Sequence, residues 1–182
     1  MLLNKKVALD DCVMQRGVPA TAGSAALKNF ISPFDATVVR KLRENGFAVF
    51  ERVFKNEFGL PDLFSNGGGS LSGALLSVLS DNSEAALVND LFGTYGREAA
   101  ENGCCFIRPT YGTVSRYGLV PCAPSMDQIG VLCKTLPEGF ALLSAVAGRD
   151  ARDGAMFPDE SYSYVHLLLL RSYSSITLPI ES

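Results

Sequence analysis

The sequence contains no tryptophan and a single histidine, and charged residues make up only 19% of its 182 positions. Soluble globular chains ordinarily contain about 25% charged residues. A surface this poor in charge predicts that part of it is covered by another molecule. The 16 basic and 19 acidic residues give a net charge of −3, which argues against a main function in holding nucleic-acid phosphates.

The cysteines do not form a recognisable pattern either. They are odd in number, include one adjacent pair and show no CxxC spacing: Cys12, Cys104, Cys105, Cys122 and Cys133. A disulfide framework favours an even count in a short secreted chain, so we expect free thiols in a reducing compartment. With His166 far from every cysteine, we expect no metal site, and no segment predicts a cofactor.

Signals for export or membrane insertion are also lacking. The first residues, MLLNKK, do not contain the apolar core of a secretory signal. The longest apolar run, Val165–Leu170, is far shorter than the roughly 18 residues that span a bilayer. We therefore expect a soluble chain without a membrane span.

Short apolar segments of two kinds alternate along the chain. Residues 34–46 predict a helix with Asp35 as its N-cap and Gly46 as its stop, followed by a buried strand at 47–50. Residues 85–92 are compatible with either a helix or a strand, and residues 126–133 show a mixed pattern that assigns neither. Residues 71–79 predict a helix with Leu75, Leu76 and Leu79 on one face, 104–107 a strand, and 137–147 a helix. This alternation predicts an α/β fold.

The sequence pattern of the chain changes near residue 153. Residues 1–153 contain the alternating elements, without an internal repeat or long linker, and predict one domain. Residues 154–182 combine tyrosines, the apolar run and a Ser/Thr-rich end, without recognisable chemistry. We expect this extension either to contact a partner or to pack as a terminal strand on its own domain.

Three stretches resemble the amidase signature family, most closely its glutamyl-tRNA(Gln) amidotransferase branch. RPTYGTVSRYGLV at 108–120 and SMDQIG at 125–130 match the family's KPTYGRVSRYGLV and SLDQIG, and AVAGRDARD at 145–153 continues that match. GVPATAGS at 17–24, running on to PFDATVV at 33–39, resembles GVPTTAGS and YDATVV. GGSLSG at 68–73 resembles the glycine-rich GGSSGG loop. The resemblance implies a partial amidase-signature fold, a fragment of a mixed sheet flanked by helices.

The family's chemistry uses a Ser-Ser-Lys triad, in which a lysine acts as base, one serine relays the proton and another attacks the amide. A hydroxyl needs such activation, and the oxyanion needs free backbone N–H groups. Carried over by position, the base falls on Asp10, the relay on Ser70 and the nucleophile on Thr94. An acid thus stands where the family has its amine.

The glycine-rich turn before the nucleophile also departs from the family. Its DTGGS motif reads DLFGT here, so that Phe92 replaces a glycine. Gly96 and Glu98 replace the family's following arginine and proline. We therefore expect a catalytically inactive chain, in which Asp10, Ser70 and Thr94 are vestigial positions.

The resemblance covers roughly residues 7–153, about a third of the enzyme, so we expect other protein subunits to cover the incomplete sheet. The leading hypothesis is an inactive accessory or structural subunit of a larger complex, with no small-molecule substrate, located in mitochondria and belonging to a respiratory complex or ribosome.

The alternative is one part of a split amidotransferase completed by a second chain, which should keep its lysine at position 10. A third is a binding module with an ammonia-channel or tRNA-docking surface, which no basic cluster supports. Arg40, Lys41 and Arg43 are instead interpreted as a solvated helix face.

Overall fold

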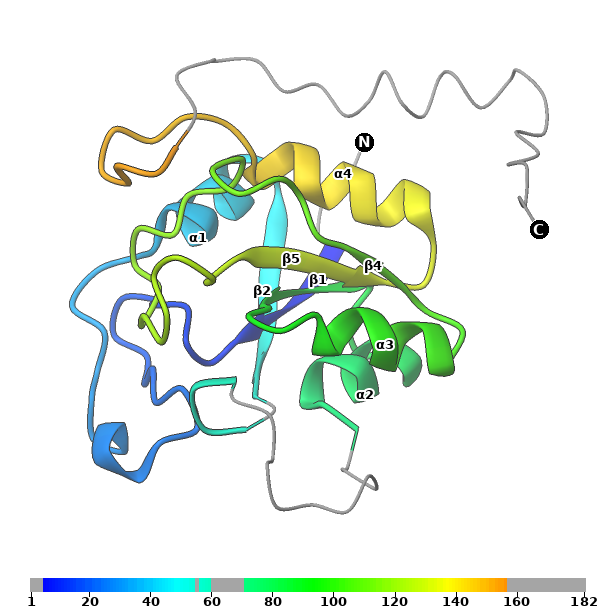
Figure 1. The fold of residues 1–182 in the computed structure, drawn as a ribbon, viewed down its shortest axis with the longest axis horizontal. Coiled ribbons are helices and arrows are strands. Elements are labelled where there is room, and N and C mark those ends of the chain that lie inside the picture. The colour runs from blue at the N-terminus through cyan, green and yellow to red at the C-terminus, as the bar shows by residue number, and fades with distance from the viewer. Residues whose placement is uncertain (1–4, 55, 60–70, 157–182) are drawn as a thin grey trace.

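The computed structural model describes residues 5–54, 56–59 and 71–156 (Figure 1). Its regular elements follow one another in the order β1 (Lys5–Asp10), α1 (Thr37–Glu44), β2 (Phe47–Val53), α2 (Gly73–Leu79), β3 (Ala85–Asn89), α3 (Thr94–Glu101), β4 (Cys105–Ile107), β5 (Ile129–Cys133) and α4 (Leu136–Val146). The α/β class predicted from the sequence is confirmed. None of the helices within these ranges is long and apolar enough to cross a membrane.

The strands form one mixed sheet in the order β2-β1-β3-β5-β4. β1 runs parallel to both β2 and β3, whereas β5 is antiparallel to β3 and β4. The carboxyl ends of β1, β2, β3 and β4 therefore meet at one edge of the sheet, together with the start of β5. Ligands of open α/β sheets bind at such edges, which makes this edge the place to look for a site.

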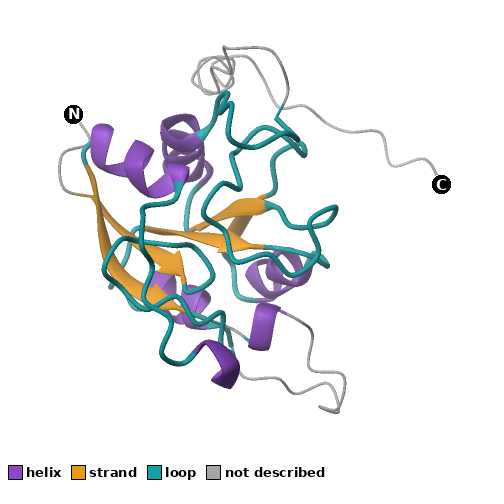
Figure 2. Cartoon of the chain, turned by 90° about the vertical axis from the view of Figure 1, so that its left-hand side faces the viewer, coloured by secondary structure: helices purple, strands orange, loops and turns teal. Residues whose placement is uncertain are grey.

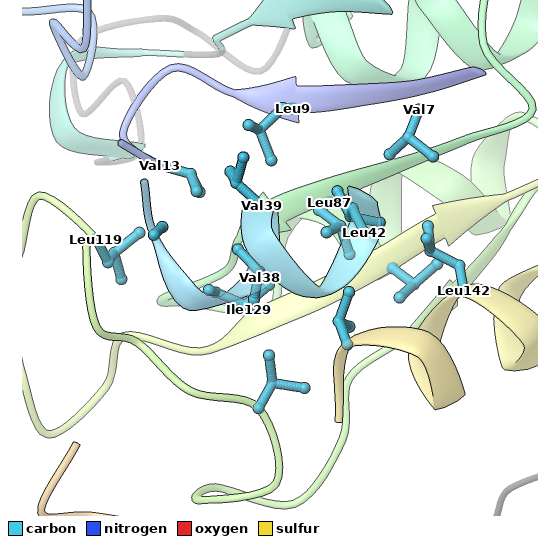
Figure 3. Packing of buried hydrophobic residues seen from close by; sticks show 14 of the residues in the cluster. Val7, Leu9, Val13, Val38, Val39, Leu42, Leu87, Leu119, Ile129 and Leu142 are labelled. Carbon is cyan, nitrogen blue, oxygen red and sulfur yellow. The ribbon is translucent and has the colours of Figure 1, made fainter. Parts of the chain in front are cut away.

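Helices cover both faces of the sheet, as Figures 1 and 2 show. On one face, α1 and α4 pack against a cluster that includes the fully buried Leu9, Leu42, Leu87 and Leu142 (Figure 3). On the other face, α2 and α3 enclose a smaller cluster around Ala8, Ala86 and Leu132. Successive strand residues alternate between the two clusters, because side chains on a strand alternate between its faces.

The predicted helix 34–46 is confirmed over Thr37–Glu44, but its predicted cap is wrong. Ala36 occupies the N-cap position without a side-chain hydrogen bond. The Asp35 carboxylate instead accepts the backbone N–H of Arg16 at 2.8 Å and pairs with Arg43. The Asp35 carboxylate therefore makes tertiary contacts and does not form the helix cap that the local sequence predicts.

A close backbone contact fixes where α1 begins. Gly118 has φ +86°, and a Cβ there would lie 2.5 Å from the Cα of Ala36. Met14 donates its backbone N–H to the Gly118 carbonyl at 2.8 Å, and Thr37 donates to Tyr117 at 3.1 Å. Only glycine allows the loop to approach the helix this closely.

The apolar face predicted for helix 71–79 is partly wrong. α2 begins at the Ser72 cap, whose Oγ accepts the Leu75 backbone N–H at 3.2 Å. Its buried residues are Ala74, Leu75, Ser77 and Val78, whereas Leu76 is 50% and Leu79 37% exposed. Leucine content alone did not indicate which helix face meets the sheet.

The remaining predicted elements agree with the structure, with adjusted bounds. The strand predicted at 47–50 continues to Val53, the open segment 85–92 contains β3, and the mixed segment 126–133 contains β5. The strand at 104–107 is β4, and the helix at 137–147 is α4. β1 and α3 were not predicted. Of the extension 154–182, the structure describes only residues 154–156.

The central core gives a direct test of this packing. Truncating the fully buried Leu87 in β3 by Leu87→Ala removes its isopropyl group from the cluster on the face covered by α1 and α4, and leaves a cavity. We expect the free energy of unfolding to fall by about 2–5 kcal/mol in urea denaturation. The matched truncation Leu76→Ala, on the exposed side of α2, should leave the denaturation midpoint almost unchanged. Equal losses at the two positions would contradict the core described above.

Candidate functional site

Asp10, the predicted vestigial base position, lies at the carboxyl end of β1, beside the end of β3. Its side chain is buried, and both oxygens accept backbone N–H groups. Oδ1 accepts from Cys12 at 3.2 Å, and Oδ2 accepts from Asn89 at 3.1 Å. The carboxyl group thus ties the ends of two adjacent strands together.

Burial raises the pKa of Asp10, although the hydrogen bonds from Cys12 and Asn89 and the charge of Arg52 oppose this shift. The pKa of the Cys12 thiol is also raised well above its ordinary value, first by burial and then by Asp10. A thiol attacks as its thiolate, so a neutral, buried Cys12 is a poor nucleophile. Asp10 and Cys12 therefore stabilise the local structure, and neither provides an activated nucleophile.

The space in front of Asp10 is nearly closed. Aromatic side chains from three segments narrow the cavity, which measures about 10 Å³ and is lined by Asp10, Cys12, Ala22, Phe54, Asn56, Phe58, Asn89 and Tyr95. A cavity of this size holds about one water molecule. No amide substrate fits in it without rearrangement of its lining.

Tyr95 is a residue of this site that the sequence interpretation missed. It is 2% exposed, stacks against Phe106 with ring centroids 5.9 Å apart, and fills the cavity from the first turn of α3. Burial raises the pKa of its phenol well above the usual value, and the charges of Asp10 and Cys12 add to this shift. An aromatic residue directly after the nucleophile position is the signal that could have revealed it.

Thr94, the predicted nucleophile position, does not line the cavity with Asp10. It is the first residue of α3 and follows Gly93, which has a left-handed backbone with φ 74°. The structure therefore brings Asp10 and Tyr95 to one cavity, and not Asp10 and Thr94. Ser70, the predicted relay position, lies outside the described residues.

The Asp90 carboxylate accepts hydrogen bonds from backbone N–H groups at the start of α3. Its Oδ1 accepts the backbone N–H of Tyr95 at 3.5 Å, and Gly93 and Thr94 also donate to it through their backbones. Its Oδ2 lies 3.2 Å from the Arg108 guanidinium. Burial raises the pKa of Asp90 despite these partners. This carboxylate therefore holds the turn before α3.

A second polar network joins β3 to the segment before β5. Asn89 donates from Nδ2 to Asp127 at 2.9 Å and accepts the Gln128 backbone N–H at 2.9 Å. Asp127 also accepts the backbone N–H groups of Cys122 and Ala123, both at 3.2 Å. The DQIG sequence at 127–130 therefore organises the loop above the sheet.

A third group of side chains clamps the end of the described chain onto α1 and the loop 113–117. Asp150 accepts hydrogen bonds from Thr37, from Ser115 at 2.8 Å and from Arg152 at 2.9 Å. Asp153 receives the Arg116 guanidinium at 2.9 and 3.1 Å. We call these side chains the Asp150 clamp. They join residues more than 100 positions apart in the sequence.

The clamp lowers the pKa of both carboxyl groups. Burial by itself raises the pKa of Asp150, but the hydrogen bonds from Arg152, Thr37 and Ser115 outweigh it and hold the pKa well below the usual range. Asp153 follows the same balance, with Arg116 as the opposing partner that lowers its pKa. Such a shift stabilises the folded state at neutral pH.

Within residues 5–54, 56–59 and 71–156, no group of three or more His, Cys, Asp or Glu residues is arranged to hold a metal ion. The sequence expectation about His166 falls outside these ranges. All five cysteines are free thiols.

Comparison with known proteins gives a consistent result. The family profile named Amidase matches residues 2–60 and 63–168. The chain is 38% identical over 168 residues to the A subunit of the glutamyl-tRNA(Gln) amidotransferase from Trichodesmium erythraeum, covering 84% of this chain and 35% of that protein. For its counterpart in Syntrophus aciditrophicus the identity is 39% over 173 residues, with coverages of 87% and 36%. The chain thus spans little more than a third of these relatives.

Solved structures show the same likeness. The A subunit of the glutamyl-tRNA(Gln) amidotransferase from Thermotoga maritima superposes with a TM-score of 0.72 at 34% identity, over 86% of this chain and 38% of that one. The peptide amidase of Stenotrophomonas maltophilia gives a TM-score of 0.78 at 28% identity, over 90% and 38%. The predicted partial amidase-signature fold is confirmed.

The Asp150 clamp predicts an acid-sensitive contribution to stability. Because the pKa of Asp150 is lower in the folded than in the unfolded chain, its stabilisation is complete above the unfolded value of about 3.9. It is lost as the pH falls through that value towards the folded pKa. Asp150→Asn should lower the free energy of unfolding by about 1–3 kcal/mol at pH 7, and the difference from wild type should shrink between about pH 4 and pH 2.

Urea denaturation at a series of pH values measures this difference. Glu101→Gln, at a side chain that is 66% exposed, is the matched control and should change stability little at any pH. A difference for Asp150→Asn that is constant from pH 7 to pH 2 would show that its carboxylate charge does not carry the clamp.

Proposed function

The chain belongs to the amidase family, and we propose that it is a catalytically inactive member acting as an accessory or structural subunit of a larger protein assembly. The observation that carries this proposal is the state of the cavity at Asp10. A buried carboxyl group, bonded to two backbone N–H groups, faces a space of about 10 Å³. The resemblance requires a lysine amine and room for an amide substrate at this place.

The surroundings of the nucleophile position support inactivity further. Thr94 does not share the cavity with Asp10. Phe92 is 49% exposed where the family has a glycine. The surroundings of Asp10 and the turn before Thr94 thus both depart from the family's pattern, which supports inactivity. The same observations weigh against a split amidotransferase, which needs its base.

A contact surface for protein partners supports the second part of the proposal. Among the described strands β2 pairs only with β1, so β2 forms one edge of the sheet. Phe50 in β2, Phe54 directly after it and Leu76 in α2 are 51%, 59% and 50% exposed. Exposed apolar side chains at a strand edge favour association with another protein. The net charge of −3 favours protein over nucleic acid as the primary neighbour.

The relatives bear on the kind of assembly. Their names describe them as subunits of glutamyl-tRNA(Gln) amidotransferases. We extend this to a multiprotein complex that contains the present chain. We further propose that this complex lies in mitochondria, as part of a respiratory complex or ribosome.

Amide hydrolysis tests the catalytic half of the proposal. Glutamine and a peptide amide are the appropriate substrates, given the relatives' names. Ammonia release should equal the blank for the purified chain, and Thr94→Ala should change nothing, in the chain or in the complex isolated from its source cells. Thr110→Ala, at an exposed threonine, is the matched control. Activity that disappears in Thr94→Ala but persists in Thr110→Ala would overturn inactivity.

Native size tests the assembly half. The endogenous chain, 19.5 kDa by sequence, should migrate on native gels and in size exclusion with other protein chains at a much larger mass. The complex should lose this chain when Phe50 and Phe54 are both changed to Ser, whereas Ile31→Ser, at an exposed apolar residue elsewhere, should keep it. Migration of the wild type as a free monomer would contradict a subunit function.

A further inference from the structure

Two cysteines face each other across the antiparallel pair β4–β5. The register places Cys105 directly opposite Cys133. Directly opposite residues share a face of the sheet, with Cα atoms about 4.5–5.5 Å apart. A disulfide needs Cα atoms about 4.4–6.8 Å apart, so this pair meets its main requirement without movement of the strands.

The thiols point across the pair. Cys133 donates from Sγ to the Cys105 carbonyl at 3.7 Å, and Cys105 donates from Sγ to the Lys134 carbonyl at 3.8 Å. The Cys133 sulfur thus contacts the backbone of Cys105, and the Cys105 sulfur contacts the backbone of the residue that follows Cys133. Cys104, although adjacent in sequence, packs against the cluster on the opposite face of the sheet.

The two thiols differ in their access to solvent. Cys133 is fully buried beneath α4, where a Cβ at Gly139 would lie 2.5 Å from its sulfur. Cys105 is half-buried and lies on β4, the edge strand of the described sheet. An oxidant therefore reaches Cys105 first, and Cys133 is placed to react with the product.

We infer that Cys105 and Cys133 are an oxidative modification site, which a hydroperoxide converts into a reversible cross-strand disulfide. The Cys105 thiolate attacks one peroxide oxygen, the O–O bond breaks, and hydroxide leaves to give a sulfenic acid. The Cys133 thiolate then attacks that sulfur, the S–O bond breaks, and a second hydroxide leaves. Two thiols and hydrogen peroxide thus give one disulfide and two water molecules, with two electrons passing from sulfur to oxygen.

The environment of Cys133 makes this reaction slow at neutral pH. Burial raises the pKa of Cys133 to about 12, and Cys105, Glu138 and Cys104 add to the shift while a hydrogen bond from the Gly139 backbone opposes it. Because the thiolate is the reacting form, disulfide formation should accelerate as the pH rises. The product would fix the three-residue strand β4 to β5.

The test uses the full chain treated with hydrogen peroxide and digested under non-reducing conditions. We expect the intact mass to fall by two hydrogen atoms, and a crosslink to join the peptides that contain Cys105 and Cys133. Dithiothreitol should reverse both changes, and the rate should rise from pH 7 to pH 9.

Because Cys104 and Cys122 share tryptic peptides with the reacting pair, variants complete the assignment. The crosslink should persist in C104S and in C104S/C122S, and should vanish in C105S. A crosslink that persists in C105S and vanishes in C104S would overturn the inference. So would over-oxidation of Cys105 in the wild type while Cys133 stays a free thiol, a measurement that does not depend on whether any variant folds.

Discussion

The parallel pairing of β1 with β3 is the constraint on which the rest of the structure depends. It places Leu9 opposite Leu87 in the middle of the sheet, between helices on both faces. It also brings the ends of the two strands together, so that the Asp10 carboxyl group can accept the Asn89 backbone N–H. The core and the candidate site are thus two results of one register: apolar side chains pair along the strands, and polar groups meet where the strands end.

The segments that most resemble the family perform a structural function in this chain. Asp127 and Gln128 organise the loop above β3, while Ser115, Arg116, Asp150 and Asp153 hold the end of the described chain against α1. The departures from the family instead fall at Asp10, which lines the cavity, and at Phe92 and Thr94, in the turn and first residue before Tyr95. This distribution separates what the fold requires from what hydrolysis requires. A chain can keep the first set of residues and the architecture with it, without keeping the second.

Sequence and structure agree best where a motif extends over many residues. The long match at 108–130 predicted the family and its mixed sheet, and short apolar runs located β2, β4 and α4. Single-residue assignments were weaker because distant contacts decide them. Asp35 binds Arg16 and Arg43 and does not cap the helix. Leu76 faces solvent because neighbouring α2 residues pack against the sheet. Tyr95 could not be placed in the cavity until β1 and α3 were positioned in space. At position 10 the sequence shows an acid where the family has a lysine, whereas the two backbone hydrogen bonds of that acid became visible only in the structure.

The carboxyl group of Asp10 has a consequence for the evolutionary reversibility of this site. Its two backbone hydrogen bonds and the aromatic side chains in front of it support each other, because each leaves less room for a longer side chain. A return to lysine at this position alone would bury an ammonium group without an acceptor and leave two N–H donors unpaired. In these surroundings a carboxyl group therefore fits position 10 better than an amine does, and a lysine there would need a rearranged cavity lining that includes Tyr95.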